Sequence, residues 1–176
     1  LQQATALVYE KGFSYCLIAG VDTFLTTQTL AAYEEKGRLL TSVNSNGFIP
    51  GEGGAAVLIG AGKKRQNAAL TINGIGFGTE TATIDSGEPL RADGSVQAFR
   101  RVFSATGLSM RDINYRITDY NGEQYKFKEG DLAVIRSLRD HKGEIDVWHP
   151  ADCIGEVGAA TVPFVIGVAE AAARKN

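Results

Sequence analysis

The sequence Asn46-Gly-Phe-Ile-Pro-Gly-Glu-Gly-Gly-Ala-Ala56 joins a polar, glycine-rich loop to an apolar run that ends at Ile59. Glycines clustered this closely mark backbone that turns sharply or packs directly against other backbone. The apolar run 53–59 has the composition of a strand. We therefore expect a loop over residues 41–52 that leads into a strand, at a place where backbone segments come close.

Apolar periodicity predicts two helices and a strand before this stretch. Residues 1–11 and 26–36 have helical spacing, and the two helices should stop at Gly12 and Gly37. Between them, residues 15–19 form a short apolar run that is typical of a strand covered on both faces.

Beyond the stretch, residues 68–77 predict a further strand, antiparallel to the preceding one because the connection is short. Residues 94–106 predict a helix with Asp93 as its N-cap and Gly107 as its stop.

The second half of the chain alternates strands with helices. The expected elements are a strand at 113–118, a helix around 132–138, a strand at 145–148 and a final helix at 157–174. Such alternation predicts βαβ units and a mostly parallel sheet, which is an α/β fold. No linker interrupts the pattern, so we expect one domain over residues 1–176.

Composition excludes several classes of function. With 44% apolar and 22% charged residues over 176 positions, the chain suits a single globular domain and argues against disorder. Its 18 Lys and Arg residues are balanced by 20 Asp and Glu residues, which gives a formal charge of −2. Nucleic-acid binding and membrane-surface binding depend on a basic surface, so we expect neither.

The location is expected to be cytoplasmic and reducing, because only two cysteines occur and no signal segment is seen. The uncharged stretch 157–169 is shorter than the roughly 20 residues that a membrane-spanning helix needs. It predicts a helix buried inside the protein.

Motif searches exclude other chemistries. The sequence Gly74-Ile-Gly-Phe-Gly78 lacks the helix-opening glycine of a dinucleotide loop, and no histidines or cysteines have metal-ligand spacing. We therefore expect no cofactor and no metal. Of the two histidines, His141 lies in a polar run, whereas His149 follows a predicted strand, where α/β sheets place functional groups. His149 is a candidate catalytic residue, with a purely structural role as the alternative.

Three segments, in chain order, resemble the β-ketoacyl synthases, which have the thiolase-like fold. Leu17-Ile-Ala-Gly-Val-Asp-Thr23 is similar to the AGGVD strand and turn of that family, and residues 46–56 are similar to its DGFVPGEGAA loop. Gly158-Ala-Ala160 resembles the end of GHxxGAAG, which opens a buried helix, and Asp112-Ile-Asn-Tyr115 resembles the DIDYV run before a strand. The resemblance implies an α/β, thiolase-like layered fold with a mostly parallel sheet and a buried Gly/Ala-rich helix.

The resemblance also implies a set of active-site positions. In the family, a cysteine carries an acyl thioester, while two histidines and usually a lysine support decarboxylation and stabilise the oxyanion. The cysteine would precede Leu1 and so is not in this chain. The first histidine aligns with Asp119, the lysine near Pro150 and the second histidine with Gly155. Aspartate has the wrong charge to stabilise an oxyanion, and glycine has no side chain to donate a hydrogen bond.

Further expectations follow from the family. The chain should be an internal fragment of a thiolase-like domain, because the family's motifs continue beyond both ends. The family acts in fatty acid or polyketide biosynthesis and is usually homodimeric. The expected partners are therefore an acyl thioester or an acyl carrier protein, and a second copy or another synthase subunit.

Three functions stay open. The first is a synthase-like protein that handles acyl thioesters but has lost the residues needed to condense them in the usual way. The second is an active acyltransferase or condensing enzyme whose acid–base chemistry falls to Asp119, His149 or Glu156, with its cysteine upstream of Leu1. The third is a protein-binding domain, which an interior without a pocket near Asp119 and Gly155 would support.

Overall fold

The computed structural model describes residues 1–61, 70–138, 143 and 145–175. These residues form two compact units, which we describe separately. The first unit comprises Leu1–Thr71, Ile117–Gly122 and His149–Asn176, and the second comprises Ile72–Arg116 and Glu123–Trp148.

The first unit is built on a two-stranded sheet. Its elements are α1 (Gln2–Tyr9), β1 (Tyr15–Thr23), α2 (Thr27–Glu35), β2 (Glu52–Gly60), α5 (Ala151–Ile154), η2 (Gly158–Ala160) and α6 (Thr161–Lys175). The strands β1 and β2 pair antiparallel over nine residues, from Tyr15 opposite Gly60 to Thr23 opposite Glu52. Both strands and all of these helices except the short α5 were expected from the sequence.

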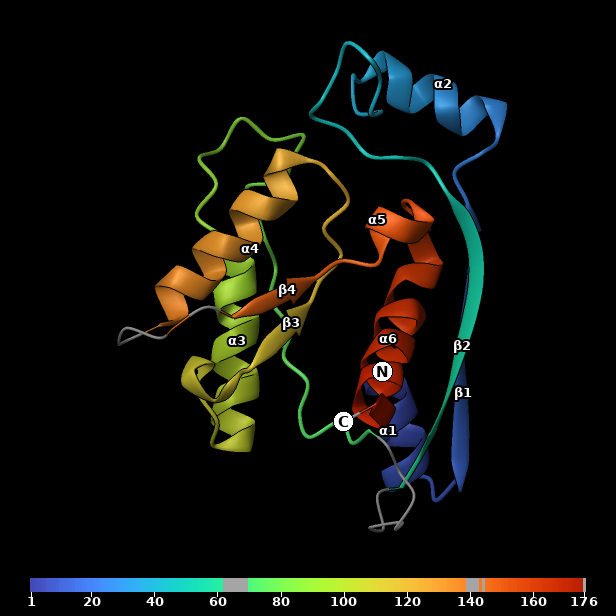
Figure 1. Cartoon of the computed structure of the whole chain (residues 1–176). Helices are drawn as coiled ribbons and strands as arrows, with labels where there is room; N and C mark the ends of the chain where they lie inside the picture. The colour runs from blue at the N-terminus through green and yellow to red at the C-terminus, as the bar shows by residue number, and fades with distance from the viewer. Residues whose placement is uncertain (62–69, 139–142, 144, 176) are drawn as a thin grey trace. The chain divides into compact units, whose positions relative to one another are not determined.

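Side chains alternate between the two faces of this sheet. Helices α1 and α6 pack against the sheet (Figure 1). The opposite face carries Leu17, Val21 and Leu58, whose exposed fractions are 65%, 78% and 64%. The prediction that β1 is covered on both faces is therefore wrong for the part of the chain that the structure describes.

Backbone comes very close to backbone where β1 meets η2. A Cβ atom at Gly20 would overlap the carbonyl oxygen of Ala159, so only glycine fits there. Two positions further along β1, Asp22 Oδ2 accepts a hydrogen bond of 2.9 Å from the Ala159 amide. The segments that resemble AGGVD and the end of GHxxGAAG are thus direct neighbours.

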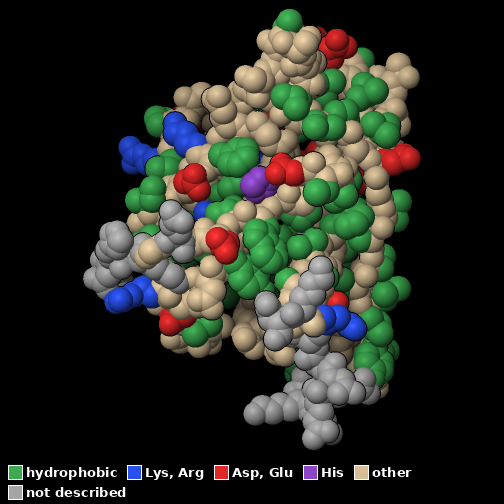
Figure 2. Space-filling model, viewed as in Figure 1, with side chains coloured by type: hydrophobic (Ala, Val, Ile, Leu, Met, Phe, Trp, Pro, Cys, Tyr) green, Lys and Arg blue, Asp and Glu red, His purple; other side chains and the backbone are tan. Residues whose placement is uncertain are grey.

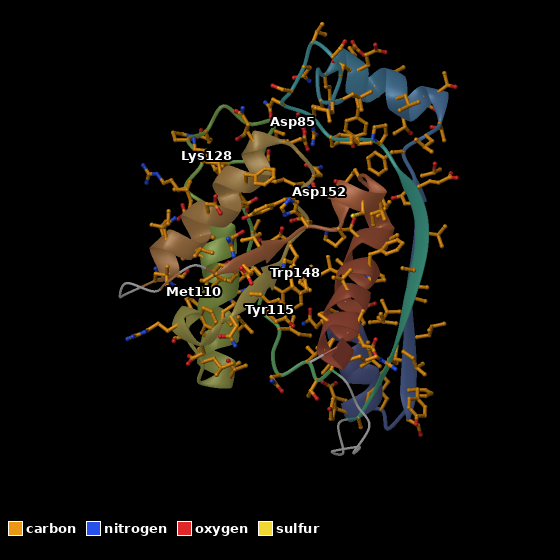
Figure 3. The ribbon with its side chains drawn as sticks, in the orientation of Figure 1. Asp85, Met110, Tyr115, Lys128, Trp148 and Asp152 are labelled. Carbon is orange, nitrogen blue, oxygen red and sulfur yellow. The ribbon has the colours of Figure 1, made fainter. Side chains whose placement is uncertain are left out.

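The second unit contains α3 (Asp93–Thr106), η1 (Met110–Asp112), β3 (Tyr115–Ile117, which ends in the first unit), α4 (Gln124–Ser137) and β4 (Asp146–Trp148). Helices α3 and α4 pack around Ala92, Val96 and Ala133. Strands β3 and β4 are paired, and the ring of Tyr115 stacks on that of Trp148 with 5.1 Å between centroids (Figure 3). The order strand, helix, strand confirms the pattern predicted for this half of the chain.

Tyr125 on α4 is partly buried in this unit. Its Oη donates a 2.9 Å hydrogen bond to the carbonyl oxygen of Ala82. Burial raises the pKa of Tyr125 above its ordinary value of 10.0, and the nearby carboxylates of Glu129 and Glu80 raise it further.

Residues 70–77, expected to belong to a strand at 68–77, form no strand; residues 68 and 69 lie outside the described residues. The glycines of this segment pack on α3 instead. A Cβ atom at Gly76 or Gly78 would overlap a carbonyl oxygen of that helix, belonging to Ala98 or Gly94. Close helix contact therefore explains these glycines without any bound dinucleotide.

Two helices end at the predicted glycines. Gly37 directly follows the C-cap of α2 and Gly107 is the C-cap of α3, with φ values of 62° and 72°, the left-handed conformation that ends a helix. Helix α1 instead ends at Tyr9, with Glu10 as its C-cap, before Gly12 is reached. Asp93 is not the N-cap of α3: the cap is Ala92, and Asp93 Oδ1 instead accepts from Arg136 Nη1 at 2.6 Å. Across the described part of the chain, no helix has both the length and the hydropathy needed to cross a bilayer.

Candidate active site

A small pocket lies in the first unit, where residues from 118–119 meet residues from 150–164. It contains about 10 Å³ of free space, which is room for about one water molecule. The lining residues are Thr118, Asp119, Pro150, Ala151, Ile154, Gly155, Glu156, Val157, Thr161 and Phe164. The pocket therefore has apolar walls with carboxylate and hydroxyl groups among them.

The three positions that the resemblance assigned to histidine, lysine and histidine all lie at this pocket. Asp119 follows β3 and is exposed to solvent, while Pro150 and Gly155 flank α5. Although more than 30 residues separate Asp119 from the other two, the fold brings all three to one place. At these three positions the resemblance implies basic side chains. The chain instead has the carboxylate of Asp119, the proline ring of Pro150, which cannot donate a hydrogen bond, and Gly155, which has no side chain.

Gly155 cannot be replaced by a residue with a side chain without moving its neighbours. Its φ is 73° and its ψ is −171°, a conformation reserved for glycine. A Cβ atom there would lie 2.7 Å from the carbonyl oxygen of Ile49. No imidazole could be accommodated at this position in the present backbone.

The glycine-rich loop packs against the segment 154–156, which lines the pocket. The Glu156 amide donates to the Ile49 carbonyl at 2.8 Å, and the Gly51 amide donates to the Glu156 carbonyl at 3.0 Å. A Cβ atom at Gly51 would overlap the carbonyl oxygen of Ile154. The loop at 46–56 is therefore rich in glycine because its backbone docks directly on the segment that carries Gly155.

Glu156 presents its carboxylate to a set of hydrogen-bond donors. Its Oε2 accepts from Asn121 Nδ2 at 2.6 Å, and its Oε1 accepts from the Gly158 amide at 3.1 Å and from Thr161 Oγ1 at 3.5 Å. Asn121 is only 8% exposed. Sequence reasoning considered Glu156 only as a substitute acid–base residue and did not identify Asn121, since nothing in the local sequence shows that the two meet.

His149 does not line this pocket. Its side chain is 24% exposed and its Nε2 lies 2.9 Å from Asp152 Oδ2, a residue of α5 (Figure 3). The Tyr120 ring lies 6.0 Å away between centroids. In Figure 2 the histidine, in purple, reaches the surface beside a carboxylate. His149 is thus next to Pro150 in the chain but faces another partner, and His141 lies outside the described residues.

Over the ranges that the structure describes, no group of three or more His, Cys, Asp or Glu side chains is placed to hold a metal ion.

Comparison with known proteins gives the fold. The sequence matches no protein-family model and no curated protein. A ketosynthase domain of oxazolomycin biosynthesis from Streptomyces albus JA3453 matches with a TM-score of 0.79 at 16% identity, over 97% of this chain and 32% of that one. The ketosynthase of module 6 of the bacillaene synthase from Bacillus subtilis 168 gives 0.74 at 19% identity, over 97% and 33%.

A β-ketoacyl synthase from Burkholderia phymatum STM815 is similar as well, with a TM-score of 0.69 at 17% identity, over 99% of this chain and 46% of that one. This chain therefore spans a third to slightly under half of the length of these structures. The expected fold class is confirmed: the chain has the α/β, thiolase-like fold of the ketosynthases. Two details of the expectation are wrong for the described residues: β1 and β2 pair antiparallel and not parallel, and most side chains of α6 are partly exposed, so the helix is not buried.

Proposed function

We propose that this chain is part of a β-ketoacyl synthase-like protein that binds acyl thioesters but does not condense them in the usual way. The observation that supports the proposal is the pocket where Asp119, Pro150 and Gly155 meet. These three positions carry no imidazole or ammonium group. The two units described above would then belong to one thiolase-like domain.

The charge at the pocket argues against condensing activity. Condensation passes through an oxyanion, which positioned hydrogen-bond donors stabilise. A carboxylate about 4 Å from a developing oxyanion would raise its energy by about 4 kcal/mol at an effective dielectric constant of 20. Such an increase slows a reaction about a thousandfold. Because Asp119 is exposed, screening by solvent and salt lowers the repulsion between its carboxylate and such an oxyanion below this figure.

The expected partners are an acyl thioester or an acyl carrier protein, and either a second copy of the protein or another synthase subunit, in the cytoplasm. Two similar structures supply the support by analogy. One is a type II polyketide synthase acyl carrier protein in complex with its ketosynthase, and the other is a ketosynthase in complex with its chain length factor from Xenorhabdus doucetiae. Both match this chain with a TM-score of 0.76 at 14% identity.

The test supplies the complete protein with malonyl- and acyl-thioesters and follows β-ketoacyl product by mass spectrometry. Binding is measured separately by calorimetry, with an acyl-pantetheine analogue in which a methylene group replaces the thioester sulfur. We expect binding of the analogue and no β-ketoacyl product. Ordinary condensing turnover would overturn the proposal, and so would failure to bind the analogue.

An active enzyme with substituted residues is the second candidate, because the Glu156 carboxylate is held at the pocket by Asn121. In this case a cysteine upstream of Leu1 would be the nucleophile. Replacing His149 by Ala tests whether this residue takes part in the reaction. Loss of activity would give it a catalytic role, and an unchanged rate would remove it from the mechanism.

A further inference from the structure

We propose that Asn73 is a site of spontaneous modification, where the side-chain amide is lost and the bond to Gly74 becomes a mixture of aspartate and isoaspartate linkages. The reaction consumes only water. The inference is independent of the proposed function, because it rests on the local structure of one segment of the second unit.

The sequence supplies three candidates for this chemistry. Glycine directly follows asparagine at Asn46, Asn73 and Asn121. In such a pair the glycine nitrogen can attack the carbonyl carbon of the asparagine side chain, because glycine has no Cβ atom to hinder the approach. The sequence treats the three pairs alike, so the fold decides which of them reacts.

The pair at Asn121 is protected by burial and by a bond to a carboxylate. Asn121 is 8% exposed, and its Nδ2 donates a 2.6 Å hydrogen bond to Glu156 Oε2. A Cβ atom at the following residue, Gly122, would lie 2.5 Å from the carbonyl oxygen of Gly47. Attack by the Gly122 nitrogen therefore requires this bond to break and the segment to open.

The pair at Asn46 is held by its backbone. The Asn46 amide donates to Asn44 Oδ1 at 3.1 Å, and the Phe48 amide donates to a backbone carbonyl at 2.9 Å. Gly47 lies between them and is buried against the backbone of Leu39. Its nitrogen cannot turn toward the Asn46 side chain without local opening.

Asn73 lacks both kinds of protection. It is exposed and lies outside any helix or strand, and neither its side chain nor the Gly74 amide makes a hydrogen bond within the described part of the chain. The atom nearest to a Cβ placed on Gly74 is Thr106 Cγ2, the end of a side chain, whereas Gly47 and Gly122 meet backbone. The fold therefore leaves this pair free to react.

The reaction balances with water as the only co-reactant. The Gly74 nitrogen bonds to Cγ of Asn73 and gives up its proton, and the side-chain nitrogen leaves with that proton as ammonia. Water then opens the five-membered imide at one of two carbon–nitrogen bonds. One opening restores the normal backbone with a side-chain carboxylate, and the other leaves an isoaspartate whose main chain is one methylene longer.

The longer main chain would disturb a packed register. Gly74, Gly76 and Gly78 each pack on α3, and their spacing of two residues indicates an extended chain. Two extended residues span about 6.8 Å and four helical residues about 6 Å, so the glycines keep step with the turns of α3. An extra methylene directly before Gly74 breaks this step, so we expect the converted protein to unfold at a lower urea concentration.

The experiment incubates the complete protein in mildly alkaline buffer, which favours loss of the proton from the attacking nitrogen. Tryptic digestion and mass spectrometry follow the conversion, because the three pairs fall on separate peptides, residues 39–63, 66–91 and 117–126. Incubation in urea gives the rate of each pair without the fold. Asn73→Gln is the control variant, since the longer side chain cannot form the five-membered imide.

We expect Asn73 to convert in the folded protein at nearly its rate in urea. Asn121 should convert about 10- to 100-fold more slowly in the folded protein than in urea, which is the protection that a hydrogen bond to a charged group gives. Asn46 should be slowed as well, and the three rates in urea should be similar. Asn73→Gln should abolish conversion of peptide 66–91 and leave the other two peptides unchanged.

Equal rates at the three pairs in the folded protein would overturn the inference, and so would conversion of Asn46 or Asn121 ahead of Asn73. Conversion of peptide 66–91 that persists in Asn73→Gln would place the reactive residue elsewhere. An unchanged urea midpoint after conversion would refute the argument from the packed register.

Discussion

Substituting Gly155 by Ala tests the geometry on which the site depends. The residue has φ of 73° and ψ of −171°, and a non-glycine residue held in such a conformation costs about 1–3 kcal/mol. The new Cβ atom would lie 2.7 Å from the Ile49 carbonyl oxygen and 3.2 Å from the Gly51 nitrogen. Overpacking of this kind costs about 1–3 kcal/mol. Together they predict a loss of about 2–6 kcal/mol in the free energy of unfolding.

The assay is urea unfolding followed by circular dichroism. With a denaturant slope of about 2 kcal/mol/M, the midpoint should fall by about 1–3 M. Gly167→Ala is the matched control, because Gly167 lies inside α6 with no neighbouring atom within 4 Å of the added Cβ. Alanine there should stabilise the helix by about 0.5–1 kcal/mol. A fall of less than about 0.5 M in Gly155→Ala would refute the described backbone of the pocket.

Three further predictions concern other close contacts. Gly76→Ala should lower the free energy of unfolding by about 1–3 kcal/mol, because the new methyl group would overlap the Ala98 carbonyl oxygen; a neutral effect in urea unfolding would contradict this packing. Asp22→Ala removes the acceptor of the Ala159 amide and should cost about 1–3 kcal/mol, with faster hydrogen exchange at that amide; unchanged exchange would show that the bond is not formed in solution. Burial and two nearby carboxylates raise the pKa of Tyr125 above 10.0, so the folded state holds this proton more tightly and loses stability as the pH rises through 10 and above. Tyr125→Phe should reduce that loss of stability at alkaline pH while lowering the free energy of unfolding by about 0.5–1.5 kcal/mol at neutral pH. Thermal unfolding from pH 7 to 11 measures both, and an unchanged loss at alkaline pH would contradict the prediction.

Local chemistry made the helices predictable. Gly37 and Gly107 end their helices because only glycine adopts a positive φ at little cost, and this property belongs to the residue itself. The alternation of β3, α4 and β4 was equally accessible, because the apolar spacing of helices and strands is local.

Elements that depend on distant partners were not predictable in this way. Residues 70–77 have the composition of a strand, yet Gly76 and its neighbours pack on α3 and no pairing strand is present among the described residues. Asp93 has the right chemistry for an N-cap, but its carboxylate bonds to Arg136, 43 residues further along the chain. In both cases a tertiary contact prevailed over the local preference.

The candidate site divides in the same manner. The resemblance brought out Asp119, Pro150 and Gly155, and the structure places all three at one pocket. Their role in a reaction stays a prediction. Asn121 and Glu156 are 35 residues apart in the chain, and neither local sequence indicates that their side chains form a hydrogen bond. His149 was selected because it follows a strand, but its partner is Asp152 and it does not line the pocket.

The most direct test is an experimental structure of the complete protein with the methylene analogue bound. We expect the acyl carbonyl beside Asp119, Pro150 and Gly155, with Glu156 hydrogen-bonded to Asn121 and no imidazole in contact with the ligand. Two histidine side chains facing a cysteine thiol around that carbonyl would contradict the account, as would an analogue bound away from this pocket.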